Sequence, residues 1–174
     1  NIRLFSYYLD PNEDGKFDDG VDGYRLDHAM DNLDKKPELT NLFETFWNPL
    51  ITQLKDINPK VMIVAEQADW SDIGFDYFER AGVDRVFGFG LKGAILSFDK
   101  EKLMMLADTI FMKSPKGKEH VIFIENHDID RIATAEQNLE KRKLAAALMM
   151  TIGGIPSIYY GQEIGMTGKG GNFG

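Results

Sequence analysis

Short apolar runs alternate with helical segments along this chain, and this alternation constrains its fold more than any other feature. Five runs have the length and composition of strands, and these are residues 22–27, 60–65, 84–89, 120–124 and 155–160. The run KVMIVA at 60–65 is continuously apolar, as in a strand that is buried on both faces. Strands that alternate with helices indicate an α/β fold with a parallel sheet and flanking helices.

The segments between these strands carry apolar residues at helical spacing. Residues 38–57 are predicted to form an amphipathic helix, which Pro49 should kink or divide in two. A second clear helix is predicted at 138–152. Residues 72–81 are predicted to form a short helix, and residues 90–112 one or two more.

The composition limits the classes of partner. The 174 residues are enough for one domain with a sizeable core, and 43% of them are hydrophobic. The formal net charge of -8 argues against nucleic acid and anionic membranes as partners, and it suits a neutral substrate such as a sugar. There is no cysteine, which excludes disulfides and thiolate metal sites. No apolar run reaches membrane-spanning length, so we expect no membrane partner.

The stretch VDGYRLDHAMD at 21–31 combines the end of a strand with charged side chains. A period of two puts Arg25 and Asp27 on the same face of that strand. A guanidinium beside a carboxylate keeps the carboxylate ionised and oriented, which is the state of a nucleophile. A structural ion pair has the same pattern, so this stretch by itself leaves both interpretations open.

An acidic stretch, DPNEDGKFDDG at 10–20, precedes that strand. Its oxygen-bearing side chains alternate as in the first nine positions of an EF-hand-type calcium loop. The residues concerned are Asp10, Asn12, Asp14 and Asp18, with Gly15 at the turn and the carbonyl of Lys16 as a further ligand. Val21 replaces the glutamate that closes such loops, so Asp19 or Asp22 would have to substitute. The sequence therefore predicts a calcium site, with a solvated acidic turn as the alternative, and no organic cofactor.

Three acidic residues stand at or just after the carboxyl ends of predicted strands: Asp27, Glu66 and Asp128. Strand ends converge on one face of a parallel barrel, where active sites form. Carboxylates gathered there repel one another, so we expect the pKa of at least one to be raised. A protonated carboxyl next to an ionised one is the pair that cleaves glycosidic bonds. Structural ion pairs are the alternative, and the three strand ends together favour catalysis.

Four segments carry a resemblance to a known family. They are GYRLD at 23–27, IVAE at 63–66, FIENHD at 123–128, and GIP through YYGQE at 154–163. In this order and spacing they resemble the second half of the catalytic (β/α)8 barrel of the α-amylase family, glycoside hydrolase family 13. The likeness covers most of residues 20–166. It implies a partial TIM barrel that holds strands four to eight.

The resemblance implies a role for each matching side chain. Asp27 would attack the anomeric carbon and form a covalent glycosyl-enzyme, and Glu66 would protonate the leaving oxygen and then activate water. Asp128 would hold sugar hydroxyls and stabilise the oxocarbenium-like state. Arg25 would keep Asp27 charged, and His127 would hydrogen-bond the sugar. Retaining chemistry of this kind needs the nucleophile and the acid/base about 5–5.5 Å apart.

Part of this segment departs from the family pattern. Many members carry Lys and His three and four residues after the nucleophile, on the aglycone side, where this chain has Met30 and Asp31. The preference at the leaving-group end is therefore left open. Trp70, four residues after Glu66, offers either a face on which a sugar can stack or a core aromatic.

The length of the chain also departs from the family. The family barrel has eight strands and needs roughly 250 residues, more than the 174 here. The chain begins at Asn1 rather than Met. We expect residues 1–174 to be a piece of a longer enzyme that lacks the first three strands, the inserted domain and the C-terminal sheet domain. Alone it should be inactive and should self-associate through exposed barrel edges.

The resemblance implies retaining hydrolysis of α-glucosidic bonds in starch-type glucans, with an α-glucan oligosaccharide or polysaccharide as the partner. Transglycosylation, a non-catalytic carbohydrate-binding fragment and a calcium-binding module are the alternatives. The exact glucan and its linkage stay open. The compartment also stays open, with a bacterial extracellular or periplasmic setting as the expectation from the substrate class.

Overall fold

The computed structural model describes residues 2–33, 35–67 and 73–170. They form two compact units. The first comprises the described residues of 1–69, 74–86 and 115–118, and the second comprises those of 70–73, 87–114 and 119–174. None of the helices in the described part of the chain has the length and apolarity needed to span a membrane.

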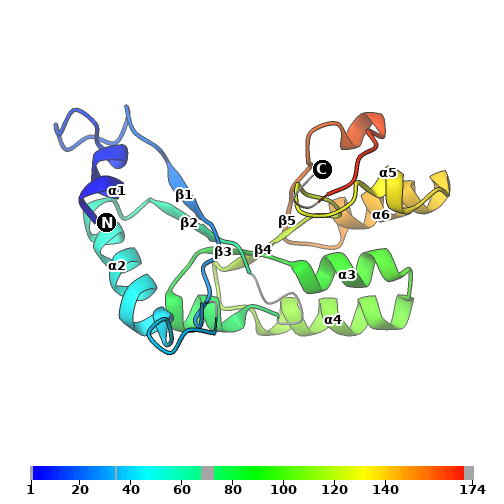
Figure 1. The fold of residues 1–174 in the computed structure, drawn as a ribbon, viewed down its shortest axis with the longest axis horizontal. Coiled ribbons are helices and arrows are strands. Elements are labelled where there is room, and N and C mark those ends of the chain that lie inside the picture. The colour runs from blue at the N-terminus through cyan, green and yellow to red at the C-terminus, as the bar shows by residue number, and fades with distance from the viewer. Residues whose placement is uncertain (1, 34, 68–72, 171–174) are drawn as a thin grey trace. The chain divides into compact units, whose positions relative to one another are not determined.

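The first unit contains helices on three parallel strands. Its elements are α1 (Ile2–Leu9), β1 (Gly23–Leu26), η1 (Phe43–Trp47), α2 (Asn48–Ile57), β2 (Met62–Ala65), η2 (Tyr77–Ala81) and β3 (Arg85–Phe87). The strands are neighbours in chain order, with Leu26 beside Ala65 and Ala65 beside Val86. Helices α1 and α2 lie side by side in the blue and cyan part of the chain (Figure 1).

The helix predicted at 38–57 is divided in two, as Pro49 suggested. Its first part, η1, is a single π-helical turn that closes with a bond from the Asn48 amide to the Phe43 carbonyl. Its second part, α2, holds Pro49 in its first turn. A proline is tolerated there because the amide that it lacks would have no partner within the helix. The first helical element, η1, begins at Phe43, several residues after the predicted start at residue 38.

Only one face of β2 is buried, although its apolar run predicted burial on both. Ile63 and Ala65 are fully buried, whereas Met62 on the other face is 38% exposed. Burying each large apolar side chain stabilises the fold by about 1.5–3 kcal/mol. The buried face packs on the helices of the first unit in a core that includes Leu9, Leu54, Phe78 and Val86. The opposite face, toward which Arg25 of β1 also points by its period of two, stays accessible.

The second unit contains two parallel strands and a pair of long helices. Its elements are α3 (Phe89–Ser97), α4 (Lys100–Lys113), β4 (Glu119–Ile122), α5 (Ile132–Ala135), α6 (Leu139–Thr151), β5 (Ile155–Pro156) and η3 (Gln162–Ile164). Strands β4 and β5 pair in parallel, with Val121 beside Ile155. Helices α3 and α4 form a hairpin, drawn in green in Figure 1. Asp99 begins α4 by accepting the amides of Glu101 and Lys102.

The fold class predicted from the alternation is confirmed, because the described chain is α/β with five parallel strands. The segment 90–112, predicted to form one or two helices, forms two. The strand predicted at 155–160 is only two residues long. Helix α5 was not predicted, and its four residues are too short to show a helical period.

Candidate active site

Two of the predicted catalytic carboxylates follow neighbouring strands. Asp27 comes directly after β1 and Glu66 directly after β2, and the last residues of these strands, Leu26 and Ala65, are paired. The Glu66 amide donates to the Leu26 carbonyl at 2.9 Å, which continues the ladder by one residue. Paired parallel strands lie roughly 4.8 Å apart. Asp27 and Glu66 therefore stand side by side at the carboxyl end of the sheet.

Arg25 joins the two carboxylates. Its Nη1 donates to Asp27 Oδ1, and its Nη2 lies 3.1 Å from Glu66 Oε2. The amide of His28 donates to the same Glu66 oxygen at 3.2 Å. The side chain of Asp27 is 78% exposed, whereas that of Glu66 is 13% exposed. One carboxylate is thus open to an incoming ligand, and the other is held between two donors.

The electrostatics favour an ionised Asp27. The hydrogen bond from Arg25 lowers the pKa of Asp27, and a hydrogen bond with the Glu66 side chain lowers it further. An ionised carboxylate at neutral pH is what a nucleophile requires. The expectation that crowding raises the pKa of at least one carboxyl group stays a prediction.

Asp128 lies in the second unit, in the loop that follows β4. The backbone amide of Asp128 donates to Asn126 Oδ1 at 3.2 Å. Asn126 Nδ2 in turn donates to Asp128 Oδ2 at 3.4 Å. His127 Nε2 lies 3.4 Å from Asp128 Oδ1, and the two side chains are 61% and 41% exposed. Both predicted sugar-contacting residues are therefore accessible and adjacent on one loop.

A buried ion pair holds this loop, and sequence reasoning missed it. Arg131 Nη1 donates to Glu125 Oε1 at 2.8 Å, and the amide of Ile132 donates to Glu125 Oε2 at 2.7 Å. The Arg131 guanidinium also stacks on Tyr159 and Tyr160, with ring centroids at 4.0 and 4.6 Å. It thereby ties the FIENHD segment to the YYGQE segment. The sequence contains all these residues, but no periodic pattern links them.

Met30 and Asp31, which depart from the family pattern, both accept hydrogen bonds from other parts of the protein. Trp47 Nε1 donates to the Met30 carbonyl at 3.1 Å. Asp31 Oδ1 accepts the amide of Phe43 at 3.0 Å. Trp70, predicted as a face for sugar stacking, lies outside the described residues.

The predicted calcium ligands make other bonds. Asp10 accepts the amides of Asp14 and Gly15, and Asn12 also accepts that of Asp14. Asp14 accepts the amide and the ammonium of Lys16. Asp18 is exposed. In the described ranges no three His, Cys, Asp or Glu side chains gather as they would around a metal. Calcium binding by this loop stays a prediction.

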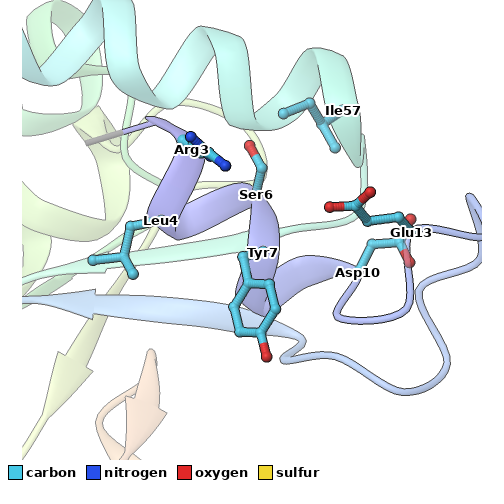
Figure 2. Close-up of a pocket in the computed structure, with 7 residues that line it drawn as sticks. All are labelled: Arg3, Leu4, Ser6, Tyr7, Asp10, Glu13 and Ile57. Carbon is cyan, nitrogen blue, oxygen red and sulfur yellow. The ribbon is translucent and has the colours of Figure 1, made fainter.

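A pocket of about 820 Å³ lies at the other end of the strands. Figure 2 shows its lining, which is Arg3, Leu4, Ser6, Tyr7, Asp10, Glu13 and Ile57. These residues belong to α1, to the loop that leads into β1, and to the last residue of α2 before β2. The pocket thus borders the amino ends of β1 and β2, whereas Asp27 and Glu66 follow their carboxyl ends. It is therefore separate from the two predicted catalytic carboxylates.

Comparison with known proteins places the chain in a family. The family described as alpha amylase, catalytic domain, matches residues 15–172. Alpha-amylase 3 of Dictyoglomus thermophilum is 32% identical over 158 residues, which are 86% of this chain and 30% of that protein. A 4-alpha-glucanotransferase of Thermotoga neapolitana is 30% identical over 166 residues, which are 86% of this chain and 32% of that protein.

A solved structure is similar as well. It is the cyclic alpha-maltosyl-(1→6)-maltose hydrolase of Arthrobacter globiformis in complex with cyclic alpha-maltosyl-(1→6)-maltose, which is 27% identical and superposes with a TM-score of 0.73. The alignment covers 89% of this chain and 34% of that one. The chain thus spans about a third of the length of the relatives it matches, and its five parallel strands are part of a (β/α)8 barrel. This protein chain therefore belongs to the alpha-amylase catalytic-domain family of glycoside hydrolases.

Proposed function

We propose that this chain carries the nucleophile and the acid/base of an enzyme that cleaves α-glucosidic bonds of starch-type glucans with retention. The observation that supports this most is the contact of Arg25 with both Asp27 and Glu66 at the ends of neighbouring strands. An ionised carboxylate beside a second carboxyl group is the arrangement that retaining glycosidases use.

The proposed reaction has two steps. In the first, Asp27 attacks the anomeric carbon, the glycosidic bond breaks, and Glu66 gives its proton to the leaving oxygen. In the second, Glu66 takes a proton from water while the water oxygen attacks the anomeric carbon and releases Asp27. The low pKa of Asp27 supports its role in the first step. For Asp128 and His127, the support is the resemblance of their segment to the family.

The proposed substrate class is an α-glucan oligosaccharide or polysaccharide. The similar hydrolase of Arthrobacter globiformis binds cyclic alpha-maltosyl-(1→6)-maltose, which is built from α-linked glucose. The net charge of -8 is consistent with a neutral ligand. Calcium takes no part in the proposed steps.

Transglycosylation is a second candidate function, because one similar protein is a 4-alpha-glucanotransferase. The two activities share the first step and differ in whether water or a sugar hydroxyl attacks the intermediate. Maltotriose separates them. A hydrolase yields only shorter sugars, whereas a transferase also yields sugars longer than maltotriose.

We further propose that the chain is part of a longer enzyme and is inactive alone. It spans about a third of its relatives, and a complete (β/α)8 barrel needs roughly 250 residues. The third candidate, a non-catalytic carbohydrate-binding fragment, is less well supported because all three carboxylates are present in the sequence.

The test is the release of reducing sugar from soluble starch. Three samples are compared: the 174-residue chain, the longer enzyme, and the longer enzyme with Asp27→Asn. We expect the longer enzyme to be active, the variant to lose about 1,000-fold or more in kcat, and the chain alone to be silent.

Asp84→Asn is the control, because Asp84 is a part-buried carboxylate near the amino end of β2. It should leave kcat unchanged. A longer enzyme that is inactive on starch and on maltotriose would overturn the proposed function, and activity of the chain alone would overturn the proposal that the site is incomplete.

A further inference from the structure

The loop that follows Asp27, the proposed nucleophile, has a strained backbone. It runs from Asp27 to η1, and three of its non-glycine residues have left-handed backbone conformations, with φ of 50° at His28, 55° at Lys35 and 57° at Asn41. Side chains disfavour this conformation, which persists only where surrounding contacts hold it. The first of the three is the residue next to Asp27, and its amide binds Glu66. The contacts that hold this loop therefore bear on the geometry of both carboxylates.

Asp31 is the residue through which the loop is held. Its carbonyl accepts the amide of Leu42 at 2.9 Å, and its Oδ1 accepts the amide of Phe43 at 3.0 Å. Its Oδ2 accepts Nη2 of Arg80 at 3.0 Å. The side chain is 20% exposed, and each of its oxygens already has a donor. Asp31 thus joins Leu42, Phe43 and Arg80.

Arg80 connects Asp31 to two helical turns. It belongs to η2, and its guanidinium binds both oxygens of Glu44 on η1, at 2.6 and 2.8 Å. The same guanidinium lies over the ring of Phe43, 5.1 Å from its centroid. The carbonyl of Arg80 accepts Nδ2 of Asn48 at 2.9 Å. One planar, five-donor group therefore joins the loop, η1 and η2, which a lysine cannot do.

Both turns that Arg80 joins are π-helical. Such turns are rare, geometrically unfavourable, and found often at functional sites. Here they pack against each other, and the arginine links them at the same end of the sheet as Asp27 and Glu66. A second part-buried carboxylate cluster lies at the amino end of β2. There Asp84 accepts hydrogen bonds from the ammonium groups of Lys55 and Lys118 and from the amide of Ile63.

We propose that Arg80 is a positioning residue for the catalytic site, acting through Asp31 to hold the loop after Asp27 and so keep the His28 amide on Glu66. This inference rests on the proposed function for its consequence in catalysis, while its structural part stands independently.

The first test measures amide hydrogen exchange by NMR in the 174-residue chain. We expect Arg80→Gln and Asp31→Asn to speed exchange at the amides of His28 and Phe43 by about tenfold or more. Asp84→Asn is the matched control, and it should speed exchange at Ile63 but not at His28. If Arg80→Gln does not fold, Asp31→Asn decides, because it keeps the size of the side chain while its single acceptor oxygen cannot accept from both the Phe43 amide and Arg80 Nη2.

The second test measures kinetics in the longer enzyme. Arg80→Gln and Arg80→Lys should lower kcat by about tenfold with little change in KM, because the groups that act in the transition state are displaced while remote sugar contacts remain. Asp84→Asn should lower the melting temperature without changing kcat.

The outcomes separate the two proposals. Unchanged exchange at His28 in both loop variants, or equal acceleration in Asp84→Asn, overturns the positioning role. An enzyme without any glycosidase activity overturns the proposed function, and the exchange experiment still decides whether Arg80 holds the loop.

Discussion

At the scale of single residues, Arg25 is the cation that contacts both carboxylates of the candidate site. It lies between an exposed carboxylate and a nearly buried one, and its hydrogen bond lowers the pKa of Asp27. A depressed pKa means that the ionised form is the favoured one in the folded chain. The interaction therefore contributes stability that is present above the ordinary pKa of aspartate and is lost as the pH falls through the lower value.

Replacing Arg25 should reverse this shift. We expect Arg25→Gln to raise the pKa of Asp27 toward its ordinary value, because the donor that favours the ionised form is gone. Carbon-13 NMR titration of the Asp27 carboxyl group in the isolated chain measures this directly. In an active longer enzyme, the acid limb of the pH–rate profile should move to higher pH. An Asp27 pKa that does not change would show that Arg25 is not its main determinant.

His120 is a second residue whose charge state is set by the fold. It is buried on β4, and burial lowers its pKa, although the bond between Nε2 and the Ile73 carbonyl at 2.7 Å opposes the shift. Since a carbonyl oxygen only accepts, Nε2 carries the proton of the neutral ring. The folded chain thus takes up a proton on His120 less readily than the unfolded chain.

The stability of the chain should depend on pH through this residue. The unfolded chain binds the proton first as the pH falls below about 6.5, so the contribution of neutral His120 is present above that pH and is lost below it. We expect the melting temperature to fall more steeply between pH 7 and 5 than that of His120→Asn. His28 and His127 are common to both proteins and cancel in the comparison. Parallel curves would contradict the prediction.

At the scale of elements, the acidic loop before β1 shows how side chains can shape a turn. Asp10, Asn12 and Asp14 each accept backbone amides within the loop. Bonds of this local kind are the usual work of Asx residues in turns. The loop also leads into the amino end of β1, the end opposite Asp27. Calcium binding here stays a prediction of the sequence.

Thermal unfolding with and without calcium separates the two interpretations. We expect the melting temperature to be the same in calcium chloride and in EDTA, because the loop closes on its own amides. Asp10→Ala should lower the melting temperature equally in both buffers, since the Gly15 amide loses its acceptor and the Asp14 amide loses one of two. A melting temperature that rises with calcium and returns with EDTA would establish the site, because a ligand that binds only the folded state stabilises it.

At the scale of the molecule, the chain leaves surfaces that a complete barrel would cover. Strand β1 is at one end of the strand order and β5 is at the other, so within the described residues each pairs with a strand along one edge only. The accessible face of β2 carries Met62, and Ile158 after β5 is 56% exposed. Free edges with apolar neighbours are templates for pairing with another chain.

The isolated chain should therefore self-associate. We expect sedimentation velocity to show a weight-average mass that rises with concentration in the micromolar range. Ile158→Lys should reduce this association, because a charge beside an edge strand opposes pairing. A chain that stays monomeric up to about 100 µM would contradict the prediction, because exposed strand edges lead to association at such concentrations.

The sequence by itself determined the fold class and placed Asp27 and Glu66 at the ends of neighbouring strands. Apolar runs of strand length, separated by helical periods, are local patterns, and three of the five predicted strands end at or are followed by an acidic residue of the candidate site. The division of one helix at Pro49 was also local, since it depends on a missing amide. Arg25 and Asp27 could be placed on one face because a strand has a period of two.

Only the tertiary structure decided which distant residues meet. Arg80 reaches Asp31 across 49 positions, and Arg131 reaches the carbonyl of Tyr160 across 29, and no periodic pattern encodes either contact. The structure also showed that Asp31 holds the loop, and that one face of β2 is open. The physical reason is that hydrogen bonds and ion pairs between remote segments depend on the packing that brings them together, whereas strands and turns depend on neighbours along the chain.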